Sequence, residues 1–510
     1  MISKVFTSIP YGFDGRIIEV ECAITQGLPR FDIVGMANKT ISEARQRVRS
    51  AIKNAGLKWP DSHITVNLAP AELAKGGVFF DIPIAISILV ASNQLTTSDV
   101  KNRIFTGELA LDGTVRPIRG ILNILEAGKS AHFKEFFIPS ANLSQAALID
   151  NITVSGFDSL TDLIQILKQQ KPAMSPPKIT LKNVVKNNKT DTEEPFLCDI
   201  YGQELAKRAL IIAIAGRHNL ILSGPPGAGK TLLARAARNL MPDLTKEEII
   251  AITKIHSLTQ DITSVITKRP FRSPHHTSSI LSLIGGGNHL NPGEISLSHL
   301  GILYLDELPE YKRETLEALR QPLEDKKISL ARANARYTYP SDFMLLATMN
   351  PCPCGYLGDK THVCKCKPSE IKRYKDKLSG PLLDRIDLRI AIERTDSKEL
   401  CIKKLTNDRE RKHNQNVVKN TITEAIRRQH ARYKDQTTYN SNLTSSQIVK
   451  KINLTNSAKS ILNQASEKLN LSARSYFKVI KVAQTIADLE EENCVNDAHI
   501  LEALSYRMDL

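Results

Sequence analysis

Residues 219–231 read Asn-Leu-Ile-Leu-Ser-Gly-Pro-Pro-Gly-Ala-Gly-Lys-Thr, and this stretch decides the fold of the centre of the chain. Its second half has the form G-x-x-x-x-G-K-[ST]. An apolar, strand-like run precedes it, and a helix-like run, residues 232–240, follows. Glycines in such a loop let successive backbone N–H groups point at a phosphate chain, and the helix N-terminus adds its positive dipole end. The stretch therefore predicts a nucleoside triphosphate site; a plain Gly/Pro turn is the alternative.

The residues of this loop receive distinct roles. Lys230 is predicted to reach the β- and γ-phosphates, and the Thr231 hydroxyl to bind Mg²⁺. The full predicted nucleotide-binding set is Gly224, Pro225, Pro226, Gly227, Ala228, Gly229, Lys230 and Thr231. The implied ligands are ATP and Mg²⁺.

Length and composition limit the class of protein. A chain of 510 residues exceeds one core, and at about 150 residues per domain it suggests three or so. The 69 Lys and Arg against 54 Asp and Glu give a net charge of +15, which favours a polyanionic partner, although nucleotide binding and solubility also use positive charge. No apolar leader follows Met1, and no apolar run is long enough to cross a bilayer. We expect a cytoplasmic protein without a membrane partner, with reduced cysteines.

The pattern along the chain divides it into four parts. Residues 1–167 mix strand-like and helical runs, and residues 168–195 are rich in Lys and Pro and read as a basic flexible linker. Residues 196–394 alternate strands and helices around the phosphate loop, which predicts a parallel sheet covered on both faces. Residues 395–510 are predicted to be helical.

Two acids follow a second buried strand. The run Gly-Ile-Leu-Tyr-Leu-Asp-Glu, residues 301–307, places Asp306 and Glu307 at the carboxyl edge of the sheet, where ligands of open α/β sheets bind. Asp306 is predicted to hold Mg²⁺ through water, and Glu307 to act as general base on the attacking water. Either acid alone is also compatible with a helix N-cap.

Two further polar residues complete the candidate catalytic set. The strand at 343–349 ends at Asn350, a position from which an amide senses the γ-phosphate. Arg385 lies between acids in Leu-Leu-Asp-Arg-Ile-Asp, residues 382–387; by itself this pattern fits a salt-bridged helix arginine better than a catalytic one.

Together these motifs resemble the magnesium-chelatase-like AAA+ ATPases, specifically the ComM/YifB family of bacteria. The motifs that carry the resemblance are residues 224–231, Arg-Pro-Phe-Arg-Ser-Pro-His-His (269–276), Gly-Gly-Gly (285–287), Pro-Gly-Glu-Ile-Ser-Leu (292–297), Leu-Asp-Glu-Leu-Pro-Glu (305–310), Asn-Pro-Cys-Pro-Cys-Gly (350–355) and residues 382–387. The resemblance implies an α/β fold with a P-loop AAA+ core and a C-terminal helical lid. It also implies a homo-oligomeric, hexameric ring in which Arg385 is an arginine finger and Arg474, in Leu471–Lys478, is the sensor-2 arginine.

The first domain resembles the proteolytic domain of Lon, a ribosomal-protein-like α/β fold, mainly through residues 107–120. Active members need a Ser–Lys dyad. Where the serine motif would fall, this chain reads Lys75 to Pro83, and where the lysine would lie it has Leu122. The resemblance therefore implies a catalytically inactive domain.

Four cysteines form the pattern C-x-C-x₉-C-x-C: Cys352, Cys354, Cys364 and Cys366. Two close pairs joined by a turn-forming loop suit tetrahedral Zn²⁺. Redox-silent thiols or a reversible disulfide are the alternatives, because the spacing is tighter than the usual C-x₂-C.

Two segments are candidates for contact with nucleic acid. One contributes Arg269, Arg272, His275 and His276; the other, a predicted hairpin at 326–337, contributes Arg332 and Arg336. These side chains could bind the phosphate backbone by charge alone. Pairing of the arginines with acids at subunit boundaries is the alternative.

Three functions are compatible with these residues. The resemblance implies an ATP-dependent DNA helicase or translocase that acts on single-stranded and branched DNA, promoting branch migration in homologous recombination during natural transformation. A magnesium-chelatase-type motor subunit and an ATP-driven protein remodeller are the alternatives. Stimulation of ATP hydrolysis by DNA distinguishes the first from the other two.

Overall fold

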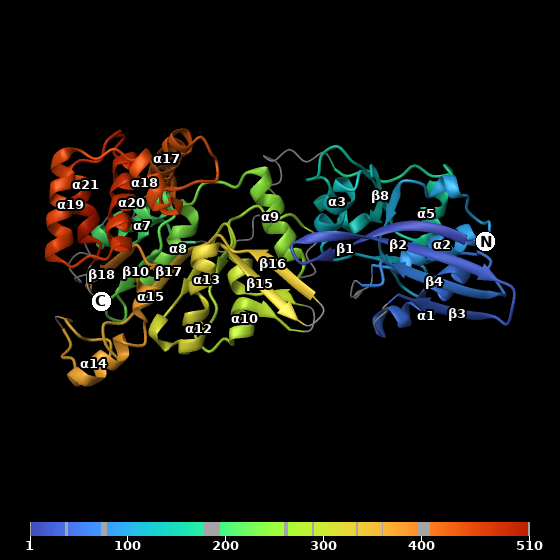
Figure 1. The fold of residues 1–510 in the computed structure, drawn as a ribbon, viewed down its shortest axis with the longest axis horizontal. Coiled ribbons are helices and arrows are strands. Elements are labelled where there is room, and N and C mark those ends of the chain that lie inside the picture. Colours follow the sequence, from blue (N-terminus) through green and yellow to red (C-terminus); the bar gives the residue numbers. More distant parts are fainter. Residues whose placement is uncertain are drawn as a thin grey trace.

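The protein folds as two α/β halves placed side by side along its long axis, with the helical C-terminal part beyond the second half (Figure 1). The computed structural model describes residues 2–35, 39–72, 79–177, 194–259, 264–287, 290–332, 335–359, 361–394 and 408–507. Among these residues, no helix combines the length and the apolar character needed to cross a bilayer.

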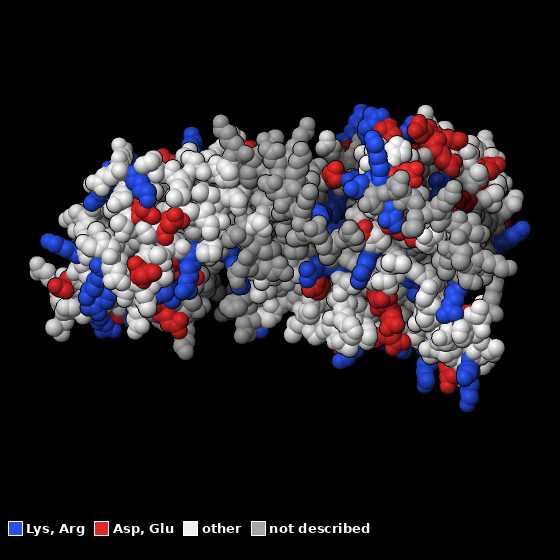
Figure 2. All heavy atoms as spheres, turned by 180° about the vertical axis from the view of Figure 1, so that it is seen from behind, with Lys and Arg blue, Asp and Glu red and all other residues white. Residues whose placement is uncertain are grey.

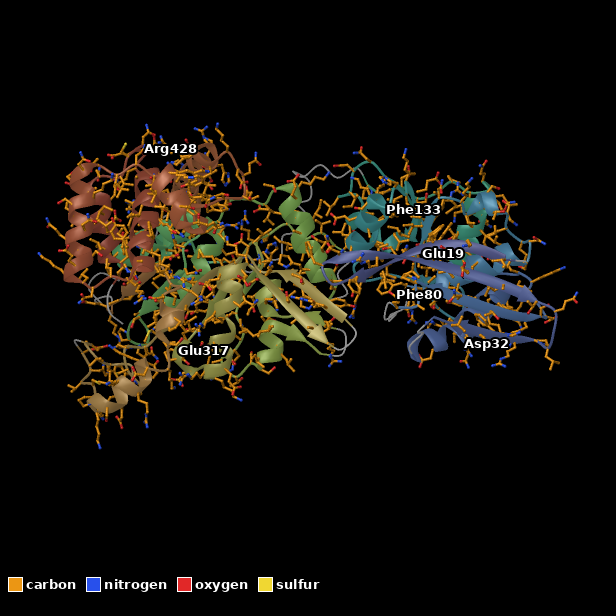
Figure 3. All side chains as sticks on the ribbon, viewed as in Figure 1. Glu19, Asp32, Phe80, Phe133, Glu317 and Arg428 are labelled. Carbon is orange, nitrogen blue, oxygen red and sulfur yellow. The ribbon has the colours of Figure 1, made fainter. Side chains whose placement is uncertain are left out.

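The amino-terminal half is a three-layer domain around a seven-stranded mixed sheet in the order β3-β4-β2-β1-β5-β8-β9. Successive side chains of a strand point to opposite faces of the sheet, so each face has its own apolar core. Val5 and Val20 pack on one face of the sheet, and Phe6 and Ile17 on the other. Figure 3 shows Phe80 and Phe133 on opposite sides of the strand that carries Glu19. The strands are β1 (Ile2–Tyr11), β2 (Asp14–Thr25), β3 (Arg30–Val34), β4 (His63–Ala69), β5 (Arg103–Phe105), β8 (Glu135–Pro139) and β9 (Thr153–Phe157).

Helices cover both faces of this sheet. One face carries α1 (Lys39–Asn54), α2 (Asp81–Ala91) and α5 (Leu160–Leu167); the other carries α3 (Ile121–Ser130) and α4 (Leu143–Ala146). Every residue of α2 is buried, including Asp81. A short hairpin, β6 (Glu108–Leu109) and β7 (Val115–Arg116), lies beside α2.

The region of the expected protease dyad is packed as a scaffold. Leu122 lies fully buried in the core under α3. Asp81 is bound by Arg47 Nε and Nη2 at 2.7 and 3.0 Å and accepts from the Leu109 N–H at 3.1 Å. Lys75 lies outside the described residues, as do the other residues of 73–78. Among the described residues of this region, Asp81 is therefore part of an internal ion pair, and Leu122 at the expected lysine position is part of the apolar core.

The predicted linker begins too early. Met174 bridges to Gly156 on the edge strand β9, and Lys171 Nζ lies 2.5 Å from Asp162 on α5. Residues 168–177 therefore belong to the amino-terminal domain, because backbone and side chains both attach them to it. Residues 178–193 lie outside the described residues.

The second half is built on five parallel strands in the order β11-β14-β17-β10-β18. Leu220 and Leu222 of β10 face one core and Ile221 faces the other, so the sheet is buried on both sides as predicted. The strands are β11 (Phe271–Arg272), β14 (Ile302–Leu305), β17 (Met344–Met349), β10 (Leu220–Ser223) and β18 (Leu388–Ala391). Two hairpins project from this core: β12 (Gly285–Gly286) with β13 (Asn291–Pro292), and β15 (Lys327–Arg332) with β16 (Ala335–Pro340).

The described helices of this core surround the sheet. Of these, α7 and α8 share a core with the C-terminal helices, and α14 projects away from the sheet at the lower left of Figure 1. The described α-helices of this sheet domain are α7 (Glu204–Gly216), α8 (Lys230–Leu240), α9 (Lys246–Ser257), α10 (Ile280–Ile284), α11 (Glu294–Leu297), α12 (Arg313–Ala318), α13 (Arg320–Asp325), α14 (Pro368–Lys375) and α15 (Gly380–Leu383).

The C-terminal part is helical, as the sequence predicts. Side-chain caps start four of its helices: Thr444, Thr455, Ser472 and Asn496 each accept a backbone N–H of the first turn. The helices are α17 (Asp408–Tyr433), α18 (Ser445–Lys451), α19 (Asn456–Lys468), α20 (Ala473–Leu489) and α21 (Asp497–Ser505), and α20 packs on α7 of the sheet domain.

The two halves share an interface beside the β15–β16 hairpin. Lys254 of α9 pairs with Glu126 at 2.5 Å, and its ammonium lies 4.0 Å from the ring centroid of Phe13. At the end of β1, the ring of Tyr11 meets that of Tyr337 on β16 at 4.6 Å between centroids. The amino-terminal domain therefore contacts the hairpin that carries Arg336.

Charge is distributed over the whole molecule. On the face in Figure 2, basic and acidic side chains are interspersed over both halves. The described basic side chains therefore form no single basic field on this face.

Candidate active site

Three strand ends bring the candidate catalytic residues together. The strands β10, β14 and β17 run parallel side by side, so the loops that follow them leave from one edge of the sheet. The phosphate loop follows β10, Asp306 and Glu307 follow β14, and Asn350 follows β17. Residues far apart in sequence thus meet at the carboxyl edge.

The phosphate loop has the shape of an anion cradle. Gly227 and Gly229 adopt left-handed φ angles of +80° and +83°, and the space in which a Cβ would lie on each is open. The helix α8 begins at Lys230, directly after Gly229. The loop therefore fits a polyphosphate, because backbone N–H groups and the positive end of a helix dipole surround open space.

Lys230 lies at the centre of this arrangement. Its ammonium donates to the carbonyl oxygens of Gly224 and Pro225 and, at 2.9 Å, to Asn350 Oδ1. Burial lowers the pKa of Lys230 to about 8. Asp306 and Glu307 counteract this shift, so a bound polyanion would stabilise the charged ammonium further.

The acids after β14 are held in a strained turn. Glu307 has a left-handed φ of +51°, and its N–H donates to Thr348 Oγ1 at 3.2 Å. The Thr348 hydroxyl donates to Asp306 Oδ1, which fixes the carboxylate next to the loop. His276 Nδ1 lies 4.0 Å from Glu307 Oε2, and its ring stacks near that of His275 at 4.1 Å.

The magnesium candidates lie on neighbouring elements. Thr231, the second residue of α8, accepts a long hydrogen bond of 3.5 Å from the Tyr304 hydroxyl of β14. Burial raises the pKa of Tyr304 to about 12, so this hydroxyl stays protonated. Thr231 and Asp306 offer the oxygen ligands that Mg²⁺ prefers.

Arg385 and Arg474 lie at the opposite edge of the sheet. Arg385 precedes β18, and its carbonyl accepts from the side chain of Asn219, the residue before β10. Glu324, near the end of α13, binds both arginines: Arg385 Nη2 at 2.5 Å through one oxygen and Arg474 through the other. Because the phosphate loop leaves from the other end of β10, neither guanidinium contacts the nucleotide site of its own chain.

A buried ion pair fixes this arginine pair to the C-terminal helices. Asp387 is bound by Lys478 of α20 at 2.7 Å and lies 3.3 Å from His218 Nδ1. Burial raises the pKa of Asp387, but the Lys478 ammonium and the hydrogen bond with His218 outweigh it and hold this pKa far below its usual range. Arg474 lies one helical turn before Lys478 on α20. The pair between Lys478 and Asp387 therefore fixes this helix to the residue just before β18.

The four cysteines form a compact cluster. All are free thiols, and their sulfur atoms lie within 4.8 Å of one another. Cys352 Sγ is 3.3 Å from Cys354 and 3.6 Å from Cys364. Four sulfurs at about 2.3 Å from one tetrahedral zinc lie about 3.8 Å apart, so the geometry fits. Backbone N–H groups of Tyr356 and Lys365 lower the pKa of Cys354, which favours a thiolate ligand.

Three of the predicted DNA contacts from the first segment have other partners. Arg269 is 5% exposed; its guanidinium binds Glu248 at 2.9 and 3.1 Å and the carbonyl oxygens of Pro242 and Leu300. The prediction that Arg269 contacts DNA is therefore wrong, because its side chain is buried and hydrogen-bonded inside the protein. Arg272 forms a bidentate pair with Glu294 at 2.6 and 2.7 Å, and His276 faces Glu307.

The second segment forms the predicted hairpin. Arg332 ends β15 and Arg336 lies at the start of β16, and both side chains are exposed. Residues 333 and 334 between them lie outside the described residues. His275, also exposed, bonds to Thr277 at 2.8 Å.

Sequence reasoning missed three residues of the site. Glu324 sits in an ordinary helical pattern, and nothing local marks it as the shared partner of two arginines. Thr348 lies inside an apolar strand, where a lone threonine is unremarkable. Arg394 follows β18 and donates to the Pro226 carbonyl of the phosphate loop at 3.3 Å; a basic residue after a strand of the sheet was the available signal.

Comparison with known proteins supplies the family context. Three family profiles match: "Subunit ChlI of Mg-chelatase" over residues 20–142, "Magnesium chelatase, subunit ChlI" over 196–400, and "Magnesium chelatase, subunit ChlI C-terminal" over 412–507. Competence protein ComM of Haemophilus influenzae is 41% identical over 510 residues, covering 99% of this chain and 97% of that protein. YifB of Escherichia coli is 40% identical with the same coverage. Lon protease 2 of Bacillus subtilis is 27% identical over 180 residues, 31% of this chain and 32% of that protease.

Proposed function

Because the chain belongs to the ComM/YifB family of magnesium-chelatase-like AAA+ ATPases, as the sequence motifs predicted, we propose that it is a ring-shaped, ATP-dependent DNA helicase. The fold class expected from the sequence, an AAA+ core with a helical lid behind a Lon-like domain, is confirmed, and the family implies ATP hydrolysis. The proposed task is to act on single-stranded and branched DNA and to promote branch migration in recombination during natural transformation. The name of the Haemophilus relative, a competence protein, supports this choice of process.

One observation carries the proposal. Glu324, which binds Arg385 and Arg474, lies in α13 immediately before β15 of the hairpin. A neighbouring subunit's nucleotide that attracts the two arginines competes with Glu324 for them. The hairpin with exposed Arg332 and Arg336 therefore hangs directly from the element that senses the neighbour, and this linkage is what a motor needs to move a phosphate backbone.

The same geometry supports a homo-oligomeric ring, which we propose to be a hexamer. Arg385 and Arg474 lie at the sheet edge opposite their own phosphate loop, so each can serve only a site on another subunit. A closed ring gives every site one such partner through a repeated head-to-tail interface. Arg385 acts there as the arginine finger, and Arg474 beside it as the sensor-2 arginine.

In hydrolysis, the described residues divide the work. Lys230 and the loop glycines bind the phosphates, and Thr231 with Asp306 would hold Mg²⁺, which supplies charge neutralisation between the phosphate oxygens. Glu307 takes a proton from the attacking water, and Asn350, bound to Lys230, orients that water. The neighbour's arginines stabilise the charge that develops on the γ-phosphate.

The hairpin arginines give the direct test. Arg332→Ala with Arg336→Ala is expected to reduce DNA-stimulated hydrolysis and strand displacement while basal hydrolysis and assembly remain. The salt dependence of single-strand binding should flatten by a log–log slope of roughly 1.4, since two phosphate contacts are lost. Removal of two exposed arginines from α17, Arg409→Ala with Arg427→Ala, is the matched charge control. Unchanged affinity and slope with failed assembly would assign the hairpin to the subunit interface and overturn the DNA proposal.

A magnesium-chelatase-type motor or a protein remodeller is the second candidate, favoured by the chelatase family profiles. Three- and four-way junction DNA separates the two. Strand displacement coupled to ATP hydrolysis supports the helicase. ATP hydrolysis that DNA of any length fails to stimulate supports a motor whose substrate is not DNA.

We also propose that the four-cysteine cluster holds one structural Zn²⁺ per subunit. Support comes from four free thiols at the spacing of a tetrahedral site. Metal analysis of protein purified without chelator should give stoichiometric zinc, and Cys364→Ser with Cys366→Ser should abolish it. Wild-type protein without zinc would refute the assignment.

A further inference from the structure

The cysteine cluster lies directly against the phosphate loop. Gly355, between the two cysteine pairs, has a left-handed φ of +85°, and a Cβ built on it would lie 2.8 Å from Cδ of Pro226. Only glycine permits this approach. Cys352, fully buried, follows Asn350 closely in sequence, and Asn350 Oδ1 accepts from Lys230 at 2.9 Å. The cluster thus contacts the site on two sides, at Pro226 and at Asn350.

The loop between the cysteine pairs is closed by its own hydrogen bonds. Asp359 Oδ1 accepts from the N–H and the hydroxyl of Thr361 at 2.7 and 2.6 Å and from the His362 N–H at 3.1 Å. The ring of His362 stacks on Tyr356 at 4.8 Å. These bonds set the position of a small polar surface, made by Thr361 and His362, next to the nucleotide edge.

Arg394 connects this surface to the phosphate loop. Its Nη1 donates to Thr361 Oγ1 at 3.1 Å and contacts His362 Nδ1 at 3.2 Å, and its Nη2 donates to the Pro226 carbonyl at 3.3 Å. The Asp359 carboxylate forms a longer ion pair with Nε at 3.9 Å, without a hydrogen bond. The guanidinium is 36% exposed. Its hydrogen bonds therefore go to neutral acceptors at the rim of an anion cradle, and Asp359 is a longer-range charged partner.

We propose that the four-cysteine metal site is a brace for the nucleotide site, and that the residue it positions, Arg394, contacts ATP bound in the same subunit. Arg394 lies at the carboxyl edge, opposite Arg385 and Arg474, so it serves its own site while they serve the neighbour's. An arginine whose hydrogen bonds go to neutral acceptors gains more from a polyphosphate than one already hydrogen-bonded to a carboxylate. The proposal rests on the assignment of the phosphate loop as the ATP site.

The brace has a physical reason. Four free thiols with their sulfur atoms within 4.8 Å of one another make only weak contacts, whereas one metal ion bound to all four would cross-link the two cysteine pairs. Without those four metal bonds, we expect the segment that carries Gly355 and Thr361 to shift more easily, so that Arg394 loses part of its support. Metal loss should therefore weaken ATP binding.

The experiment uses full-length protein and a fluorescent ATP analogue, with binding measured in the absence of hydrolysis. Removal of zinc by a chelator should raise the Kd about tenfold, and added ZnCl₂ should restore it. Arg394→Ala should raise the Kd by a similar factor while zinc content stays stoichiometric, and Arg394→Lys should recover only part of the loss. In Arg394→Ala, zinc removal should add little, because both changes act through one contact.

Two controls separate a brace from a general loss of structure. Cys494→Ser removes an exposed cysteine outside the cluster and should leave zinc content and the Kd unchanged. Thermal unfolding and size-exclusion profiles report whether zinc-free protein remains folded, and Arg394→Ala keeps the test valid if it does not. An unchanged Kd in Arg394→Ala, or in folded zinc-free protein, overturns the proposal. If Lys230→Ala also binds ATP normally, the error lies in the ATP site itself, and loss of DNA stimulation with normal ATP binding concerns only the helicase proposal.

Discussion

Replacement of Arg269 by alanine should destabilise the ATPase core and leave the DNA-binding chemistry of folded molecules intact. The guanidinium is buried against Glu248 and donates hydrogen bonds to the carbonyl oxygens of Pro242 and Leu300. After Arg269→Ala, Glu248 keeps a longer contact to Arg217 at 3.4 Å and the hydrogen bond from the Thr245 N–H at 3.1 Å. Removing one partner of a buried charge pair costs about 3–5 kcal/mol, because the other charge stays desolvated and loses its nearest counter-charge.

In a domain of this size, that loss lowers the melting temperature by roughly 6–20 °C. Thermal unfolding, together with hydrogen exchange of α9 and β11, measures it directly. Arg272→Ala is the matched control: its pair with Glu294 is partly exposed, with Arg272 28% and Glu294 21% accessible, so a cost of about 1 kcal/mol is expected. A variant Arg269→Ala that melts like wild type while its DNA salt dependence flattens would refute the structural role.

Four further outcomes follow from the site. Lys230→Ala should weaken ATP binding, whereas Glu307→Gln should bind ATP and stop hydrolysis; near-normal turnover by Glu307→Gln would remove it as general base. Mixing Arg385→Ala with Lys230→Ala subunits should restore hydrolysis at up to about a quarter of the interfaces, dependent on protein concentration, and no recovery in subunit-exchanging rings argues for a structural arginine. Glu324→Gln should lower the stimulation of hydrolysis by DNA without changing the Kd for ATP, since it cuts the connection to β15; normal stimulation contradicts this. Finally, burial lowers the pKa of Lys230 to about 8, and ATP binds the charged form of this lysine. The Kd for ATP should therefore rise as the pH increases above about 8, by up to tenfold per pH unit. Binding should then take up a proton, which calorimetry in two buffers detects. Equal heats in both buffers at pH 9 would show that Lys230 is already charged.

Local order in the sequence is enough to find the nucleotide-site candidates. A strand, a glycine loop, Lys-Thr and a helix follow one another, and the acids at 306 and 307 and the amide at 350 end apolar runs that read as strands. Parallel strands bring their carboxyl ends to one edge whatever their order, so the sequence alone predicts that these residues share an edge. The pairing of β10 with β17 is what brings Lys230 to Asn350. The same holds for the cysteines, since two close pairs on one short loop have little freedom to separate.

The tertiary structure decided which charged residues are occupied and which edge of the sheet each one reaches. Arg269 looked like a phosphate contact until its burial against Glu248 appeared. Arg394 and Arg474 are equally basic in sequence, yet one lies beside Pro226 and the other beside Glu324. Lys168 to Pro177 read as linker, but Met174 pairs with the edge strand. Such contacts join residues distant in sequence, and composition and periodicity carry no information about which distant residue fills the space beside a given charge. The sequence thus determined the motifs and their chemistry, while packing alone determined the partner of each cation, because that depends on the geometry with which the sheet, the hairpin and α20 come together.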